Sequence, residues 1–581
     1  MNENTDYKLV NLQKRELKLR AQRHEILVSD SEKALDMILE APSPATLIQS
    51  FPDQDLYYLM HKIGPYDFIP VLAMANSEQW EYILDVEVWD NDRLDLVLMT
   101  KTFDLLFQAD PQRLLRWVIK EKPDFFEFYL FKHMEIFIRE HDEVPPEDYD
   151  DYITIDDKFY FRFPEKPEDI DDDDWPVAQK DEDAWELIEK MLKAVAEMDL
   201  SVYHGLLLET CATQSAETEE EQFRLKNLRL AEKGFLPTHE AIGIYQPTKL
   251  SAFRKRPDTT LLKPTPFDPD MPLPPQFFHE FIEGDDLFVQ SLKLFDSESS
   301  LALESELAAL INKVISADKI KLRSKEDLEK AISKACAYLN LGLEVILKGR
   351  LSSESGQNAI KEYFLEDIFR TGSRAGITLR TKAITWFKQS FMNHNNLPLS
   401  FLGETYLGVA GGLFLDRPLY YDNYATGLLY RNFSSIPDIT KTSRILEQII
   451  AIDMVLDKLK VDISSFKEGV LTYKTLILTL WAKNRLNLDS NLEPIDTKVF
   501  KDFFIALFSK SESVHHHKIQ LNDLILWTCE ATGISQADLG NPFNEVMADL
   551  IKELEAEYGS VDPRNIDPRF IPHFILGKGE K

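Results

Sequence analysis

Seven polar and aromatic side chains that could bind a ligand lie within sixteen positions of the C-terminal half of the chain. They are Asp416, Arg417, Tyr420, Tyr421, Asp422, Tyr424 and Arg431. The glycines Gly408 and Gly412 precede them, and their spacing of four would let a helix approach its neighbour closely. Arginines and tyrosines beside such close packing are typical of a binding pocket or a protein interface. The segment is therefore the predicted ligand-binding site. The same residues also fit a second interpretation, a buried Asp–Arg pair with tyrosines that tie down a loop.

Two other groups of side chains have the chemistry of metal ligands. The acidic run Asp169–Asp174 offers the carboxylate oxygens that Mg²⁺ and Ca²⁺ prefer, but it lacks the spacing of an EF-hand loop. The triplet His515–His517 has no cysteine or second histidine pair nearby, and adjacent side chains on a helix diverge. We interpret the acidic run as a solvated loop and the histidines as exposed loop residues. No metal ligand is assigned.

The sequence carries no signature of catalysis. It contains no phosphate-binding loop, no dinucleotide fingerprint, no zinc-protease helix motif and no nucleophile elbow. Catalytic triads are assembled from residues that are distant in sequence, so the question of an enzyme stays open. The sequence favours a non-enzymatic protein, and no catalytic residue and no cofactor are predicted.

The charge of the chain restricts its partners. Its 581 residues include 99 Asp and Glu against 66 Lys and Arg, a net charge of −33. Nucleic acids and anionic lipid surfaces both need basic residues on the protein, so neither is expected as a partner. A basic or amphipathic protein is the kind of partner that this charge favours.

The cysteines and the apolar stretches predict a cytoplasmic protein. The three cysteines are far apart in sequence, which indicates a reducing compartment without disulfides. The basic segment Met1–Arg23 has no apolar core, so it is not a secretory signal. The longest continuous apolar stretch, Thr405–Leu415, is too short for a membrane span, which needs about 20 residues.

The elements that must position these side chains are predicted to be mostly helices. In residues 29–140, short apolar stripes at helical spacing alternate with capping and stop signals. Asp53 is the predicted cap of a helix over Gln54–Ile63, and Asp110 caps another that starts at Pro111. Helices this short need packing to persist, so we expect each to bury its apolar face against the next, as in a helical-repeat, superhelical lobe.

The rest of the chain is divided by composition. Residues 141–190 carry 20 Asp and Glu against 5 Lys and Arg, and the alternation in Tyr152–Phe163 predicts a β-hairpin. Seven prolines in Pro257–Pro275 follow a basic cluster, Arg254–Arg256, which we expect to dock on the acidic protein itself. The aromatic residues Phe570 and Phe574 predict docking of the C-terminal tail on the body.

The predicted domains follow from these changes. They are a basic N-terminal segment (1–28), a helical-repeat domain (29–140), an acidic segment with the β-hairpin (141–190), a helical segment (191–250), a proline-rich linker (251–276), a C-terminal α-helical domain (277–559) and an extended tail (560–581).

Two stretches carry a resemblance to known families. SFPDQDLYYLMHKIGPYDFIPVLAMA (Ser50–Ala75) resembles the helical repeats in the cytosolic N domain of the magnesium-transporter family. The whole chain, including RLAEKGFLPTHEAIGIYQP (Arg229–Pro247), resembles a domain-of-unknown-function family of long acidic bacterial proteins. The second resemblance implies a shared fold and a cytosolic bacterial protein, and it implies no activity.

The sequence thus predicts a mostly α-helical protein with an N-terminal helical-repeat lobe, one small β-hairpin insertion and a C-terminal all-α lobe. The predicted function is a non-enzymatic scaffold or protein-interaction protein with a protein partner. The alternatives are an enzyme or small-ligand binder with its site around Asp416–Arg431, and a divalent-cation sensor.

Overall fold

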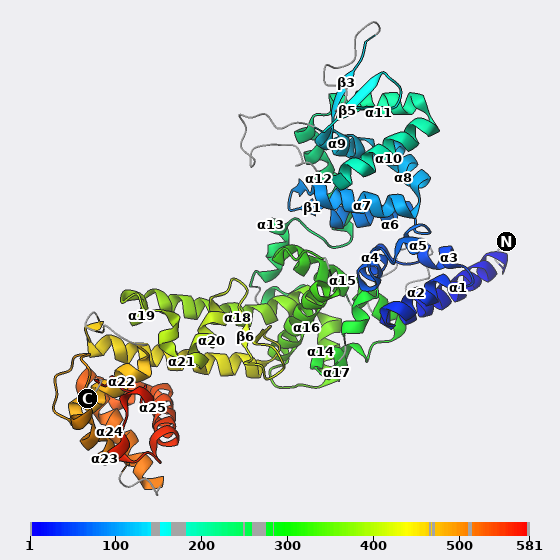
Figure 1. Cartoon of the computed structure of the whole chain (residues 1–581). Helices are drawn as coiled ribbons and strands as arrows, with labels where there is room; N and C mark the ends of the chain where they lie inside the picture. The colour runs from blue at the N-terminus through cyan, green and yellow to red at the C-terminus, as the bar shows by residue number, and fades with distance from the viewer. Residues whose placement is uncertain are drawn as a thin grey trace. The chain divides into compact units, whose positions relative to one another are not determined.

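The chain forms two compact units, and both are mostly α-helical (Figure 1). The computed structural model describes residues 3–140, 152–163, 182–247, 250–257, 275–282, 284–322, 324–463, 466, 471–508 and 514–577. The first unit comprises Met1–Cys336 and Arg350–Asp367, and the second comprises Ala337–Gly349 and Ile368–Lys581. The predicted mostly α-helical fold is confirmed. The predicted domain boundaries and the superhelical arrangement stay predictions.

A series of helices, most of them short, opens the first unit. They are α1 (Glu3–Val28), α2 (Ser31–Leu39), α3 (Pro44–Gln49), α4 (Asp53–Ile63), α5 (Ile69–Leu72), α6 (Ser77–Glu87), α7 (Leu96–Ala109), α8 (Pro111–Glu121) and α9 (Pro123–His133). Neighbours in this series contact each other, for example α4 with α6 and α8 with α9. At one such contact, the ring centroids of the buried Trp80 and Trp117 lie 5.8 Å apart. This aromatic burial stabilises helices that are too short to persist alone.

The two predicted helix caps have different outcomes. Asp110 caps α8 as predicted, because its carboxylate accepts the backbone N–H of Arg113 at 3.0 Å. The prediction for Asp53 is wrong: it is the first residue of α4, and its carboxylate pairs with Lys233. Lys233, which is distant in sequence, pairs with the carboxylate that is predicted to cap the helix.

The predicted β-hairpin is confirmed, and it belongs to a larger sheet. Strands β4 (Ile153–Thr154) and β5 (Phe159–Arg162) pair antiparallel, and a third strand, β3 (Glu135–Ile138), pairs with the other edge of β5. The backbone at Asp157 has a φ of 58°, and this left-handed residue closes the turn. The run of short helices expected over residues 29–140 therefore gives way to a strand at β3, whose pairing partner follows it in the sequence.

The remaining elements of the first unit are mainly helices. They are β1 (Trp89–Asp90), β2 (Arg93–Leu94), α10 (Glu182–Met198), α11 (Leu200–Ala212), α12 (Ser215–Glu232), α13 (Thr238–Ala241), the 3₁₀ turns Ile242–Tyr245, Leu250–Ala252 and Phe277–Phe281, α14 (Leu287–Leu292), α15 (Ser297–Asp318) and α17 (Ser353–Glu362). Helices α16 (Lys325–Leu347) and α18 (Leu365–Lys388) contribute residues to both units.

The basic cluster before the proline-rich segment docks on acidic residues of its own unit, as predicted. Lys255 pairs with Glu362 at 2.7 Å, and Arg256 pairs with Glu306 at 2.6 Å. Most of the proline-rich segment, residues 258–274, lies outside the described residues.

The second unit is helical apart from one small hairpin. Its elements are α19 (Phe391–His394), the 3₁₀ turn Leu399–Leu402, α20 (Glu404–Phe414), β6 (Tyr420–Tyr421), β7 (Tyr430–Arg431), α21 (Ile436–Leu459), α22 (Tyr473–Arg485), α23 (Thr497–Phe508), α24 (Val514–Thr532), α25 (Gln536–Tyr558) and the 3₁₀ turns Pro563–Asn565 and Pro568–Phe570.

The C-terminal tail packs on the body of the second unit. The ring of Phe574 lies 4.9 Å from that of Phe500, and the backbone N–H of Ile575 donates to the hydroxyl of Thr479 at 2.9 Å. The predicted docking is confirmed for Phe574 and wrong for Phe570, whose side chain is exposed.

Candidate functional site

The predicted site folds as a two-stranded hairpin that lies on α20. Strands β6 and β7 pair antiparallel, with Tyr420 opposite Arg431. A Cβ atom on Gly408 would lie 2.4 Å from the ring of Tyr421, and one on Gly412 would lie 2.6 Å from a backbone carbonyl oxygen. The two glycines therefore allow the hairpin to approach the helix, as their spacing predicts.

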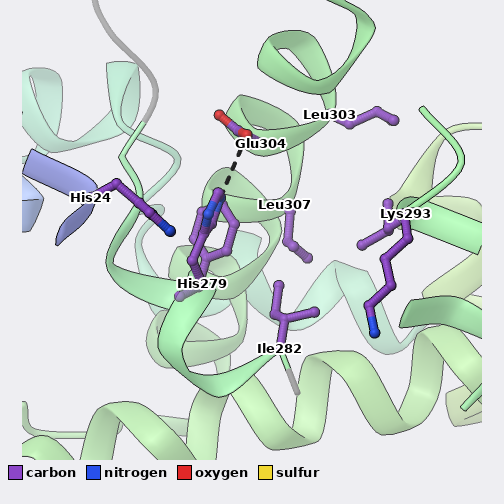
Figure 2. Close-up of a pocket in the computed structure, with 9 residues that line it drawn as sticks. His24, His279, Ile282, Lys293, Leu303, Glu304 and Leu307 are labelled. Atoms are coloured by element: carbon purple, nitrogen blue, oxygen red, sulfur yellow. Dashed lines mark ion pairs between the residues drawn. The ribbon is translucent and has the colours of Figure 1, made fainter. Parts of the chain in front are cut away.

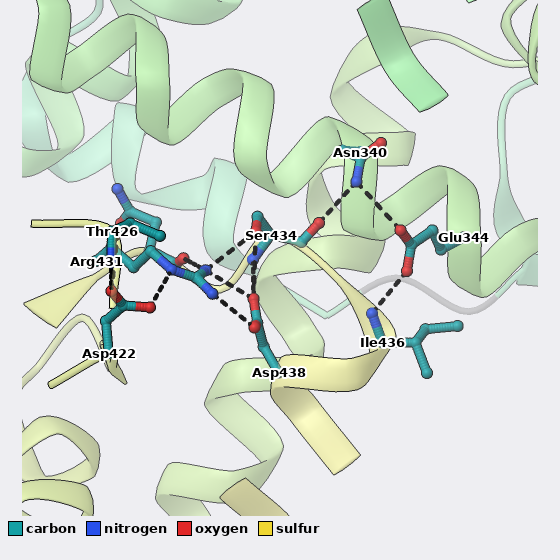
Figure 3. Close-up of polar contacts among 9 residues, drawn as sticks. Asn340, Glu344, Asp422, Thr426, Arg431, Ser434, Ile436 and Asp438 are labelled. Atoms are coloured by element: carbon teal, nitrogen blue, oxygen red, sulfur yellow. Dashed lines mark hydrogen bonds and ion pairs between the residues drawn. The ribbon is translucent and has the colours of Figure 1, made fainter. Parts of the chain in front are cut away.

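Arg431 is the centre of an ion-pair network at the base of the hairpin (Figure 3). Its guanidinium donates two hydrogen bonds to Asp438, at 2.8 and 2.7 Å, and one to Asp422 at 2.9 Å. It also donates to the hydroxyl of Ser434 at 3.1 Å and lies 4.3 Å from the centre of the Tyr420 ring. Both carboxylates are buried. The guanidinium N–H groups of Arg431 thus donate to residues of the protein itself.

The network fixes the charges of its two carboxylates. Burial raises the pKa of Asp422, but the hydrogen bonds from Thr426 and Arg431 outweigh it and hold that pKa below its usual value. Burial is likewise outweighed at Asp438, where hydrogen bonds from Arg431 and Ser434 lower the pKa. The carboxylates therefore stay ionised at neutral pH and are not poised for proton transfer.

A second set of polar contacts holds the chain directly after β7. Asn340 donates to the backbone carbonyl of Ser434 at 2.8 Å, and Glu344 accepts the backbone N–H of Ile436 at 2.6 Å (Figure 3). Both side chains come from α16, whereas Asp438 lies in the first turn of α21. The base of the hairpin is thus anchored from two helices.

The tip of the hairpin has a constrained backbone and an apolar, exposed surface. Asn423 and Tyr424 have φ angles of 51° and 62°, and the left-handed region is unfavourable for a bulky residue such as tyrosine. The side chains of Tyr424, Leu428 and Leu429 are exposed, Tyr424 to 65% and Leu428 to 56%. Asp422 closes the tip because it accepts the backbone N–H and the hydroxyl of Thr426, at 2.6 and 2.8 Å.

The structure brings only part of the predicted set together. Tyr420, Asp422 and Arg431 meet at the base, and the hydroxyl of Tyr421 donates to Asn423 at 3.1 Å. Tyr424 lies at the exposed tip.

Two further predicted residues precede the hairpin. Asp416 is exposed and pairs with Arg380 at 2.9 Å. Arg417 is half-buried. This geometry matches the second interpretation of the segment, a buried Asp–Arg pair in a tied-down loop, and binding of a ligand there stays a prediction.

A cavity in the first unit gathers two histidines that the sequence does not connect. His24 of α1 and His279 lie beside each other with ring centroids 5.4 Å apart, and Nε2 of His279 is 3.5 Å from Oε1 of Glu304 (Figure 2). The cavity has a volume of about 260 Å³. Burial and the neighbouring His279 lower the pKa of His24. No spacing pattern could have found this pair, because its members are separated by most of the first unit.

The carboxylate in this cavity is already neutralised. Arg20 donates to both oxygens of Glu304, at 3.0 and 2.9 Å. Glu304 is thus shared between the guanidinium of Arg20 and the imidazole of His279.

The predictions on metal binding fall largely outside the described part of the chain. Asp169–Asp174 lies outside it, and so do the side chains of His515–His517, whose backbone forms the first turn of α24 rather than the predicted loop. Among the described residues, no group of three His, Cys, Asp or Glu is placed to hold a metal ion. The three cysteine thiols are free.

The helices of the described ranges were also compared with the length and hydropathy that a membrane span requires. None of these helices meets both requirements.

The comparisons with known proteins find one match. A family model described as "Family of unknown function (DUF6178)" matches residues 11–577. No curated protein matches the chain, and no solved structure matches it. The resemblance of Ser50–Ala75 to the magnesium-transporter N domain stays a prediction. The match spans nearly the whole chain, so the protein belongs to the family of unknown function DUF6178.

Proposed function

We propose that the protein is a non-enzymatic protein-interaction protein, and that the tip of the β6–β7 hairpin contacts its partner. The observation that carries this proposal is the exposed set Tyr424, Leu428 and Leu429 on a loop whose base is fixed by buried ion pairs. Three exposed apolar side chains gathered on one constrained loop favour a contact with another molecule that removes them from water.

The fixed backbone of the tip favours tight binding. Association loses free energy when loops and side chains become ordered, and a loop that is already ordered avoids much of that loss. An aromatic residue flanked by aliphatic ones is the composition of an interface centre. Tyr424 is therefore the proposed anchor of the contact.

The charge of the chain selects the kind of partner. At a net charge of −33, long-range attraction favours a basic protein, and the apolar tip favours a segment with an apolar face. The proposed partner is a protein with a basic or amphipathic segment. A cytoplasmic location and a bacterial origin belong to the same proposal; the free, widely spaced cysteines support the location, and the family resemblance supports the origin.

The test is purification of the protein from its own cells in two forms. The wild type should carry a stoichiometric partner with a basic or amphipathic segment, at low and at physiological salt. The combined Tyr424→Ser, Leu428→Ser and Leu429→Ser variant should lose it with an unchanged melting temperature.

A matched control uses exposed residues of the first unit. The combined Tyr66→Ser, Leu200→Ser and Leu208→Ser variant removes one exposed tyrosine and two exposed leucines, and it should keep the partner. Retention of the partner by the tip variant, or absence of any stoichiometric partner from the wild type, contradicts the proposal.

A small-ligand site in Asp416–Arg431 is the alternative function for the same segment. It predicts that Arg417→Ala with Tyr421→Ala abolishes small-molecule binding at an unchanged melting temperature. The tied-down loop predicts a lower melting temperature instead, because the Tyr421 ring fills the space over Gly408. A thermal-shift screen of both forms separates the two functions.

Divalent-cation sensing by the N-terminal half is a third proposal. It rests on the resemblance of Ser50–Ala75 and on the acidic run Asp169–Asp174. Calorimetric titration with Mg²⁺ should then give saturable heat, and its absence removes the proposal.

A further inference from the structure

The first unit contains a larger cavity, which is independent of the hairpin and of its proposed function. Its volume is about 570 Å³, and residues of α6, β1, α7, α12, α13, α15 and the adjoining loops line it. The apolar part of the lining includes Trp89, Phe223, Leu230, Phe235 and Ile315. The size and the apolar walls fit a small organic molecule.

One amine faces this lining without a polar partner. The ammonium nitrogen of Lys226, on α12, lies 4.7 Å from the centre of the Trp89 ring and 5.4 Å from that of Phe223. Within the described part of the chain it makes no hydrogen bond and no ion pair. Burial lowers the pKa of Lys226 to about 8. A substantial fraction of this amine is therefore neutral, and nucleophilic, at physiological pH.

The carboxylates that could keep Lys226 protonated are engaged with other groups. The charged residues that line the cavity besides Lys226 and Asp85 are Glu87, Asp90, Asp92, His239, Lys319 and Lys321. Three of the four carboxylates have closer partners: the pairs are Asp85 with Arg229, Glu87 with Tyr57, and Asp90 with Lys321. Asp92 is exposed to solvent. The attraction of Asp85 raises the pKa of Lys226 and so opposes the larger effect of burial, which lowers it.

We propose that Lys226 is the nucleophile of a carbonyl-binding site, and that the cavity binds aldehydes or ketones with an aromatic or branched apolar body as reversible imines. The lone pair of the neutral amine attacks the carbonyl carbon to give a carbinolamine. Loss of water then forms the C=N bond: the carbonyl oxygen leaves with the two amine hydrogens. No oxidant or reductant takes part, and water reverses the reaction.

The surroundings of Lys226 favour a higher reactivity toward carbonyl compounds than an exposed lysine has. Burial of the amine disfavours the ammonium ion, and apolar surface around an imine disfavours the water that hydrolyses it. The rings of Trp89 and Phe223, with centroids 5.5 Å apart, offer apolar surface to the body of the carbonyl compound. Lys101 of α7 is the matched comparison, since it is exposed in the same unit.

The experiment is reductive trapping on the full-length protein. The folded chain is incubated with benzaldehyde and cyanoborohydride at pH 7.5, and N-benzyl-lysine is quantified by peptide mass spectrometry. Labelling at Lys226 should exceed that at the exposed Lys101 by about tenfold or more, because burial lowers the pKa of Lys226 below the ordinary lysine value of about 10.4. An excess below tenfold overturns the proposal.

The pH dependence of trapping supplies a second readout. The labelling rate at Lys226 should reach half its maximum near pH 8, and a midpoint near the ordinary lysine value of about 10.4 overturns the proposal. Phe223→Leu should lower labelling at Lys226 at least threefold and leave Lys101 unchanged, since a smaller wall admits water. Equal labelling in the variant and the wild type contradicts a role of the cavity. Lys226→Arg should remove the site-specific adduct without affecting Lys101.

Discussion

Two buried carboxylates each hold a segment of chain in place, and they do so with different partners. In the second unit, Asp422 receives hydrogen bonds from Thr426 and from the guanidinium of Arg431. In the first unit, Asp55 of α4 accepts the backbone N–H groups of Gln276 and Phe277, all at 2.8 to 3.0 Å, and no cation of the described residues lies within hydrogen-bond distance of it. Burial raises the pKa of Asp55 to about 7, whereas the pKa of Asp422 is lowered.

The two carboxylates differ in how far their partners offset burial: hydrogen bonds from Thr426 and Arg431 outweigh it at Asp422, whereas backbone hydrogen bonds do not outweigh it at Asp55. Backbone donors lower the pKa of Asp55, but they do not offset its removal from water. At Asp422 the hydrogen bonds from Thr426 lower the pKa most, and the guanidinium of Arg431 adds a further hydrogen bond and its charge. The carboxylates of the hairpin anchor are therefore charged at neutral pH, and the Asp55 anchor is half protonated there.

Removal of the Arg431 cation should give the largest loss in the free energy of unfolding. Arg431→Met leaves Asp422 and Asp438 buried without a counter-charge, so the free energy of unfolding should fall by about 3–5 kcal/mol. Chemical denaturation measures it. Arg380→Met is the control: its partner Asp416 is exposed, so the loss should stay at about 1 kcal/mol or less. Equal losses in both variants would mean that the network does not anchor the hairpin.

The two anchors should respond to pH in opposite directions. The folded-state pKa of Asp55, about 7, exceeds the ordinary 3.8, so the folded state binds the proton more tightly. Its contribution to stability is present at low pH and is lost, by up to about 4 kcal/mol, as the pH rises from about 4 to about 7. Asp422 and Asp438 have lowered pKa values, so their contribution is present above about pH 4 and is lost as the pH falls further.

Asp55→Asn isolates this effect. The difference in unfolding free energy between the wild type and the variant should change with pH between about 4 and 7 and stay constant above. Denaturation at a series of pH values measures it. A difference that is constant over the whole range would place the pKa of Asp55 near its ordinary value.

Disturbing the close packing between the hairpin and α20 should give a smaller loss of stability. Gly408→Ala places a Cβ atom 2.4 Å from the Tyr421 ring, so stability should fall by about 1–3 kcal/mol. Gly205→Ala, in the middle of α11 with nothing within 4 Å, should instead stabilise the protein by up to about 1 kcal/mol. Changes in melting temperature of opposite sign in the two variants confirm the close approach, and changes of the same sign contradict it.

The sequence predicts contacts that are local in the chain and misses those that are not. Asp422 and Arg431 lie nine positions apart, so composition alone places them in one cluster. Asp55 and Gln276 are separated by 221 positions, and nothing in either segment indicates the other. The same reason applies to His24 with His279. Helix periodicity predicts most of the fold, whereas β3 is missed because a strand is defined by its partner.

Site-specific photo-crosslinking can establish whether Tyr424 anchors a contact with another protein. A benzophenone amino acid replaces Tyr424 in one form of the protein and Tyr66 in another, because the two tyrosines are exposed to 65% and 63%. Irradiation in the producing cells should give one dominant adduct from position 424, with a basic or amphipathic segment of a second protein, and none from position 66. No adduct at position 424, or the same adducts at both positions, would contradict the claim.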